Sequence, residues 1–132
     1  MNRARLTTPL ETLAALGGLE IAGLCGLILG AARYRIPIVI DGFIASAAAL
    51  VAIRMQPAVK DFCLFSHLSE ESGHRLLFGA LDEQPLLNLN LRLGEGSGAA
   101  LAMGIIQSAV AVHNRMATFA DAGVSGSKDG DA

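Results

Sequence analysis

Apolar runs separated by short polar or glycine-rich breaks divide the chain into helix-length and strand-length segments. Long apolar stretches are typical of buried helices, and short branched runs are typical of strands covered on both faces. The pattern predicts helices at 9–16, 19–34, 43–55, 72–81 and 97–120. It predicts strands at 35–40 and 61–65 and a third extended piece at 85–89.

Strands alternating with helices favour an α/β fold. We expect a partial parallel sheet of about three short strands packed by helices, Rossmann-like, with a long C-terminal helix. At the amino end, Thr8 can cap the first helix, Pro9 suits its first turn and Glu11 favours the positive end of its dipole.

The branched run Ile36–Ile40 ends at Asp41 and Gly42, directly before a helix. Ligands of parallel sheets sit beyond the carboxyl ends of strands, so this turn lies where chemistry usually happens. Asp41 has two interpretations: it caps the next helix, or it hydrogen-bonds a sugar hydroxyl.

A polar segment, 66–74, follows the second predicted strand. It offers hydroxyl and imidazole groups at another strand end. The alternative is a polar surface loop in which Ser69 or Ser72 caps the following helix.

The 132 residues are 52% hydrophobic and 17% charged, which excludes a disordered chain. We expect one α/β domain at 1–122 and a disordered tail at 123–132. The formal net charge of -2 gives no electrostatic case for nucleic acid. The apolar stretch 19–32 contains Glu20 and three glycines and is short for a membrane span, so we interpret it as a buried helix without a membrane role.

Cys25 and Cys63 each lie within an apolar run, which predicts buried free thiols in a reducing compartment. Neither belongs to a Cys-x-x-Cys or Cys/His spacing, so we expect no metal site.

The loop Arg92–Gly98 contains three glycines in five positions. Glycine lets the backbone approach a ligand closely, and the helix that follows offers free N–H groups to a phosphate or carboxylate. Neither the dinucleotide fingerprint nor the Walker loop matches its spacing. Glu95, between two glycines, has no neighbouring side chains to cover it. Glu95 is either a general base that reaches a bound ligand or a solvated or capping glutamate. The loop as a whole either binds a ligand or simply connects to the helix.

Four ordered segments now carry a resemblance: GGLEIAG at 17–23, IVIDGFI at 38–44, SHLSEESGH at 66–74 and LRLGEGSGAA at 91–100. Together with MATFADAGV at 116–124, they resemble the C-terminal part of the nicotinate-nucleotide–dimethylbenzimidazole phosphoribosyltransferases. The resemblance covers the chain from about Pro9 to Val124.

The resemblance implies a cytoplasmic enzyme of cobalamin lower-ligand synthesis that needs no cofactor. It implies transfer of phosphoribose from nicotinate mononucleotide to 5,6-dimethylbenzimidazole, which gives α-ribazole 5′-phosphate and nicotinate. Glu95 matches the family's catalytic glutamate. The matching substrate-binding positions are Glu20, Asp41, Gly42, Ser69, Leu93, Gly94 and Gly96.

Members of that family are much longer than this chain, and the N-terminal half or more has no counterpart here. A homodimer, or association with the missing N-terminal portion, is therefore expected. The alternatives are a catalytically silent fragment that binds nucleotide or only assembles with another chain, and an unrelated α/β module whose glycine loop holds a phosphate.

Overall fold

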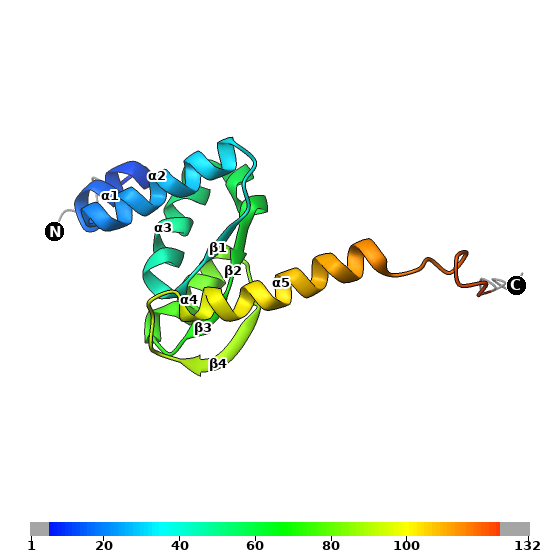
Figure 1. Ribbon diagram of the computed structural model, residues 1–132. Helices are drawn as coiled ribbons and strands as arrows, with labels where there is room; N and C mark the ends of the chain where they lie inside the picture. Colours follow the sequence, from blue (N-terminus) through cyan, green and yellow to red (C-terminus); the bar gives the residue numbers. More distant parts are fainter. Residues whose placement is uncertain (1–5, 125–132) are drawn as a thin grey trace, which may run out of the picture.

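Two pairs of short parallel strands lie among helices in the computed structural model, which describes residues 6–124 (Figure 1). The helices are α1 (Pro9–Leu16), α2 (Leu19–Arg33), α3 (Gly42–Met55), the short 3-10 helix η2 (Pro57–Phe62), α4 (Ser72–Leu81) and α5 (Ser97–Arg115). The strands are β1 (Ile38–Ile40), β2 (Cys63–Phe65), β3 (His67–Ser69) and β4 (Leu87–Leu91). The expected α/β class, the parallel strands and the long C-terminal helix are confirmed.

The two strand pairs follow each other end to end. β1 pairs with β2, and β3 pairs with β4. Between them, Ser66 donates its N–H to Ile40 O at 3.0 Å and accepts the N–H of Leu87 on its carbonyl at 3.0 Å. One residue therefore joins both ladders, and it lies at the carboxyl end of β1, where the sequence places its candidate chemistry.

Four strands form where three were expected, and the difference is β3. The polar segment 66–74, interpreted either as a site at a strand end or as a surface loop, contains a strand whose three residues are all buried, so the surface-loop alternative is wrong for these residues. Its polar groups find partners on other elements: the Ser66 hydroxyl donates to Ile40 O at 2.8 Å, for example. A polar residue is stable inside a protein when its hydrogen bonds are made, and those partners are remote in sequence.

The other strand and helix bounds shift by a few residues. Arg35 turns the chain with a φ of 58°, so the first strand begins only at Ile38. The second strand begins at Cys63 because the residues before it belong to η2, and the third extended piece becomes Leu87–Leu91. α5 ends at Arg115 rather than near 120, shortly before a separate turn in which Thr118 and Asp121 bond each other.

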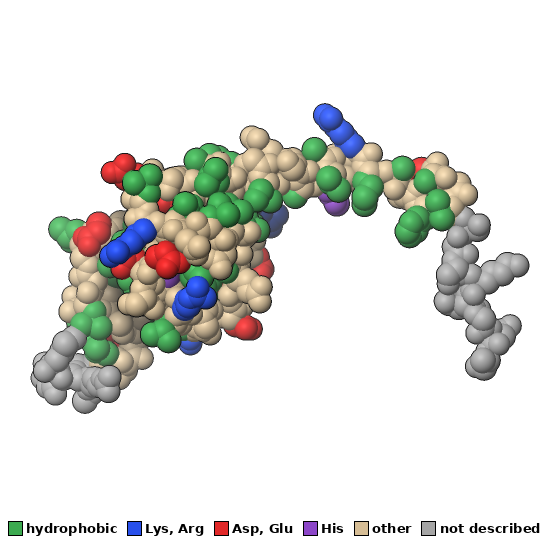
Figure 2. Space-filling model, turned by 90° about the horizontal axis from the view of Figure 1, so that it is seen from below, with side chains coloured by type: hydrophobic (Ala, Val, Ile, Leu, Met, Phe, Trp, Pro, Cys, Tyr) green, Lys and Arg blue, Asp and Glu red, His purple; other side chains and the backbone are tan. Residues whose placement is uncertain are grey.

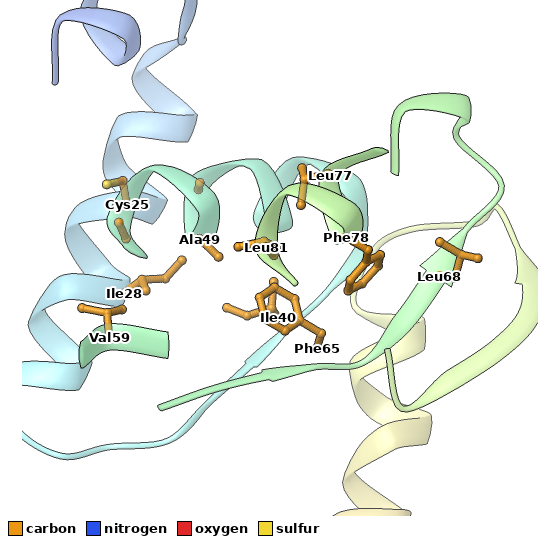
Figure 3. Packing of buried hydrophobic residues seen from close by; sticks show 12 residues of the cluster. Cys25, Ile28, Ile40, Ala49, Val59, Phe65, Leu68, Leu77, Phe78 and Leu81 are labelled. Atoms are coloured by element: carbon orange, nitrogen blue, oxygen red, sulfur yellow. The ribbon is translucent and has the colours of Figure 1, made fainter. Parts of the chain in front are cut away.

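The core lies between α2, α3, α4 and the β1–β2 pair (Figure 3). Ala48, Ala49 and Ala52 are fully buried on α3, and such small side chains let neighbouring helices approach closely. Phe65 of β2 meets Phe78 of α4 edge-on, with ring centroids 5.5 Å apart. This packing holds the strands whose ends form the site. Both cysteines are free, as expected, but only Cys25 is buried as predicted; Cys63 is half-buried.

α5 begins at the site and then leaves the body of the molecule as an arm (Figure 1). Along this arm apolar side chains face outward (Figure 2). Leu101, Met103, Ile105, Val110 and Val112 are each exposed by 45% or more. No helix within residues 6–124 is long and apolar enough to cross a membrane. Of the tail predicted to be disordered, only Gly123 and Val124 belong to the described residues.

Candidate functional site

A cavity of about 400 Å³ opens at the carboxyl ends of β1 and β3. It is lined by Gly42, Phe43, Ile44, His67, Ser69, Glu71, Arg92, Leu93 and Gly94. The residues come from three strand ends, the place where parallel sheets bind ligands. Within residues 6–124, no group of three or more His, Cys, Asp or Glu is arranged to hold a metal ion.

The loop Gly94–Gly96 forms the turn that leads into α5. Gly94, Glu95 and Gly96 have φ values of 77°, 58° and 79°, and Ser97 N–H closes the turn on Gly94 O at 3.2 Å. A glycine adopts this left-handed backbone freely, whereas a glutamate is strained by roughly 1–2 kcal/mol. Glu95, the exposed residue directly after the lining residue Gly94, thus adopts its backbone conformation at an energetic cost, which is a pattern typical of functional residues.

Asp41 fastens this turn to the sheet. Its carboxylate accepts the N–H of Gly96 at 3.1 Å and the N–H of Ala99 at 2.7 Å. The suggestion that Asp41 caps the helix directly after it is wrong, because α3 has no side-chain cap. It caps α5 instead. The positive end of the α5 dipole is therefore met by the chain's own carboxylate.

His67 lies beneath the start of α5. Its side chain is 1% exposed, and its Nδ1 is 3.7 Å from Asp41 Oδ1 and 3.1 Å from Ser66 Oγ. Gly98 packs so closely on the ring that a Cβ there would overlap Nδ1. His67 and Gly98 together set how closely α5 approaches β3.

His74 of α4 fixes the end of β3. Its Nδ1 accepts the Ser69 N–H at 3.0 Å, so its Nε2 carries the ring proton and donates to Ser46 Oγ at 3.1 Å. Burial, with a smaller contribution from nearby His67, holds the pKa of His74 below its ordinary value. A neutral imidazole therefore positions Ser69 at the wall of the cavity.

An ion pair crosses the rim of the cavity. Arg92 Nε lies 3.6 Å from Glu71 Oε1, with side chains 76% and 49% exposed. A pair this exposed adds little stability. The pair matters because of its position: it places a cation and an anion beside the opening of the cavity.

The structure brings most of the predicted site residues together. Gly42, Ser69, Leu93 and Gly94 line the cavity, while Asp41 and Gly96 form the tether behind it. Glu95 follows the lining residue Gly94. Glu20 is different: it lies exposed in the first turn of α2 and is not among the lining residues.

Two cavity residues are not assigned a role by the sequence. His67 is noted only as one of the imidazole groups of segment 66–74, and its contacts with Asp41 and Gly98 form only in the fold. Glu71 lies in the same segment and is not singled out. The available signal is the strand-like alternation in Ser66–Ser69, which is short and carries few apolar residues.

Comparison with known proteins agrees with the resemblance seen in the sequence. A family model described as phosphoribosyltransferase matches residues 1–124. The nicotinate-nucleotide–dimethylbenzimidazole phosphoribosyltransferase of Chlorobaculum tepidum is 59% identical over 129 residues, covering 98% of this chain and 36% of the relative. The enzyme of the same name from Xanthomonas oryzae pv. oryzae is 58% identical over 122 residues, covering 92% of this chain and 35% of the relative.

Solved structures share the fold as well. The crystal structure of the Thermus thermophilus nicotinate-nucleotide–dimethylbenzimidazole phosphoribosyltransferase superposes with a TM-score of 0.84 at 44% identity. The match covers 96% of this chain and 37% of that one. The chain thus spans about a third of the length of the relatives it matches. Sequence, fold and site together establish that it belongs to this phosphoribosyltransferase family.

Proposed function

We propose that this chain supplies the catalytic glutamate, Glu95, of a phosphoribosyl-transfer site. The reaction moves phosphoribose from nicotinate mononucleotide to 5,6-dimethylbenzimidazole and yields α-ribazole 5′-phosphate and nicotinate. The proposal rests above all on the strained, exposed Glu95, held between two left-handed glycines at the edge of the cavity.

The chemistry calls for one base and no strong acid. The bond between the anomeric carbon and the cationic pyridinium nitrogen breaks, and its electron pair leaves nicotinate with a neutral ring nitrogen. One nitrogen of the benzimidazole forms the new bond to that carbon. The other nitrogen must then lose its proton, and Glu95 takes it. A positioned base contributes roughly a hundred- to ten-thousand-fold to such a rate.

The remaining predicted residues hold the reactants. Gly42, Ser69, Leu93 and Gly94 line the cavity and supply close backbone and hydroxyl contacts to the nucleotide. Asp41 and Gly96 hold the loop that carries Glu95. Glu20 fits this scheme only if further polypeptide brings the start of α2 into the site. The free thiols of Cys25 and Cys63 support a reducing, cytoplasmic setting.

Further polypeptide completes the assembly. Apolar side chains are exposed along α5, and clustered exposed apolar side chains often mark a surface that another polypeptide covers. Either a second copy of this chain or the region that only the longer relatives possess covers this face. The proposed active unit is then that assembly.

The same observation favours a second candidate, a catalytically silent module that binds nucleotide or assembles with another chain. Nicotinate release from nicotinate mononucleotide separates the two. We expect the assembly that contains this chain to release nicotinate only when dimethylbenzimidazole is added. Calorimetric binding of the nucleotide without any release would favour the silent module, and absence of both would contradict the nucleotide site.

A further inference from the structure

The hydrogen bonds around His67 determine which ring nitrogen bears its proton. The Ser66 hydroxyl lies 2.8 Å from Ile40 O, a carbonyl that can only accept, so the single hydroxyl hydrogen points there. Ser66 Oγ can then only accept from His67 Nδ1, which is 3.1 Å away. Nδ1 therefore carries the proton, and in the neutral ring Nε2 is an acceptor.

Nε2 is the part of the ring left for a ligand. It has no hydrogen-bond partner within residues 6–124. It is not fully enclosed either, because the one enclosed side-chain polar atom without a partner in that range is Ser97 Oγ. His67 lines the cavity, and its Cε1 faces the turn at Gly42. The small exposed part of the imidazole therefore opens to the cavity.

The ring cannot easily turn away from this position. Gly98 covers the Nδ1 side at close range, and the His74 ring stands perpendicular to it at a centroid distance of 6.5 Å. A rigid acceptor costs little entropy when it binds a donor. The arrangement is thus prepared for a ligand group that brings an O–H or N–H.

We propose that His67 Nε2 accepts a hydrogen bond from a ribose hydroxyl of the nucleotide in this cavity, an inference that rests on the proposed function. The phosphate and carboxylate of nicotinate mononucleotide are anions that accept hydrogen bonds. Its ribose hydroxyls are its donors. The N–H of the benzimidazole is the proton that Glu95 takes, which leaves the sugar as the partner of His67.

Calorimetric titration of the full chain tests the contact with three probes: nicotinate mononucleotide and its 2′-deoxy and 3′-deoxy forms. We expect one deoxy form to bind the native chain at least about tenfold more weakly than the nucleotide itself, because without that hydroxyl His67 Nε2 stays buried and unpaired. His67→Asn keeps an N–H for Ser66 Oγ but places no atom where Nε2 lies. It should bind the nucleotide as weakly as the deoxy form and be indifferent to deoxygenation. His67→Gln returns an oxygen to the Nε2 position and should recover part of the affinity.

Imidazole ¹⁵N resonances of the native protein give a readout that needs no variant. They should report a protonated Nδ1 in the free chain and a shift of Nε2 on binding the nucleotide, absent with the critical deoxy form. Equal affinity for all three probes, or an Nε2 shift that appears only with dimethylbenzimidazole, would overturn the inference while leaving the proposed function intact. No binding of any probe to the native chain would overturn both.

Discussion

The carboxylate of Asp41 accepts the N–H of Ala99 at 2.7 Å, although 58 positions separate the two residues. This bond connects the end of β1 to the start of α5 and therefore holds the loop that carries Glu95. Asp41 thus acts as a long-range helix cap, and its loss should be felt in both stability and binding.

Asp41→Ala should lower the free energy of unfolding by about 1–2 kcal/mol, because a helix start loses its charged cap. Nucleotide affinity should fall as the loop loses its tether. Urea unfolding and calorimetry measure the two effects. Asp61→Ala is the matched control, since the exposed Asp61 side chain has no hydrogen bond or ion pair in the described part of the chain. Equal stability of the two variants would contradict the capping role.

The tether also illustrates what the sequence could and could not predict. The first helix was predicted to the residue because its signals are local: Thr8 accepts the Glu11 N–H, and Glu11 bonds back to Thr8. The sequence places Asp41 near the site but does not predict its hydrogen bonds to the N–H groups of Gly96 and Ala99. The β1–α3 turn suggested a local cap, and only the fold brings α5 to it.

The strand β3 was missed for the same physical reason. Its residues look polar in sequence, yet the polar residues on either side of it have partners on other elements: Ser66 donates to Ile40 O and His74 donates to Ser46 Oγ. Hydrophobic periodicity detects burial only when burial is apolar. The loop at Gly94–Gly96 was recognised because its glycines signal unusual backbone directly.

Gly98→Ala should destabilise the protein by about 1–3 kcal/mol, because the added methyl group overlaps the enclosed His67 ring. Gly104→Ala on the same helix is the control. A Cβ at Gly104 meets nothing within 4 Å, so that variant should gain about 0.5–1 kcal/mol from better helix propensity. Urea unfolding should show a lower free energy of unfolding for Gly98→Ala and a higher one for Gly104→Ala. A stabilising Gly98→Ala would refute the close contact between α5 and β3.

Replacing Glu95 tests whether its backbone is strained. Glu95→Gly should raise the free energy of unfolding by about 0.5–1 kcal/mol, because relief of the left-handed backbone exceeds the entropy that glycine adds to the unfolded chain. Glu95→Ala keeps the strain and should show no such gain. Thermal or urea unfolding distinguishes them, and identical stability of the two variants would argue against strain at this position.

Burial of neutral His74 predicts a pH dependence of stability. The lowered pKa of folded His74 means that the unfolded chain takes up the proton first as the pH falls. Its contribution to stability is therefore complete above about pH 6.5, the ordinary pKa of histidine, and is lost as the pH falls toward the folded value.

Urea midpoints between pH 8 and pH 5 measure this loss. His74→Gln should flatten the slope, while His113→Gln, at an exposed position on α5, should keep the native slope. A native slope in the His74 variant would show that other groups cause the acid sensitivity.

The rate of nicotinate release by Glu95→Gln tests most directly whether Glu95 is the general base. It is measured in the active assembly with saturating nicotinate mononucleotide and dimethylbenzimidazole. The amide keeps size and polarity but cannot take a proton, so we expect a rate at least about a hundredfold below native with nucleotide affinity unchanged. Glu70→Gln, an exposed neighbour of the cavity wall, should keep the native rate. A Glu95→Gln protein that releases nicotinate as fast as the native one would contradict the assignment of Glu95 as the base.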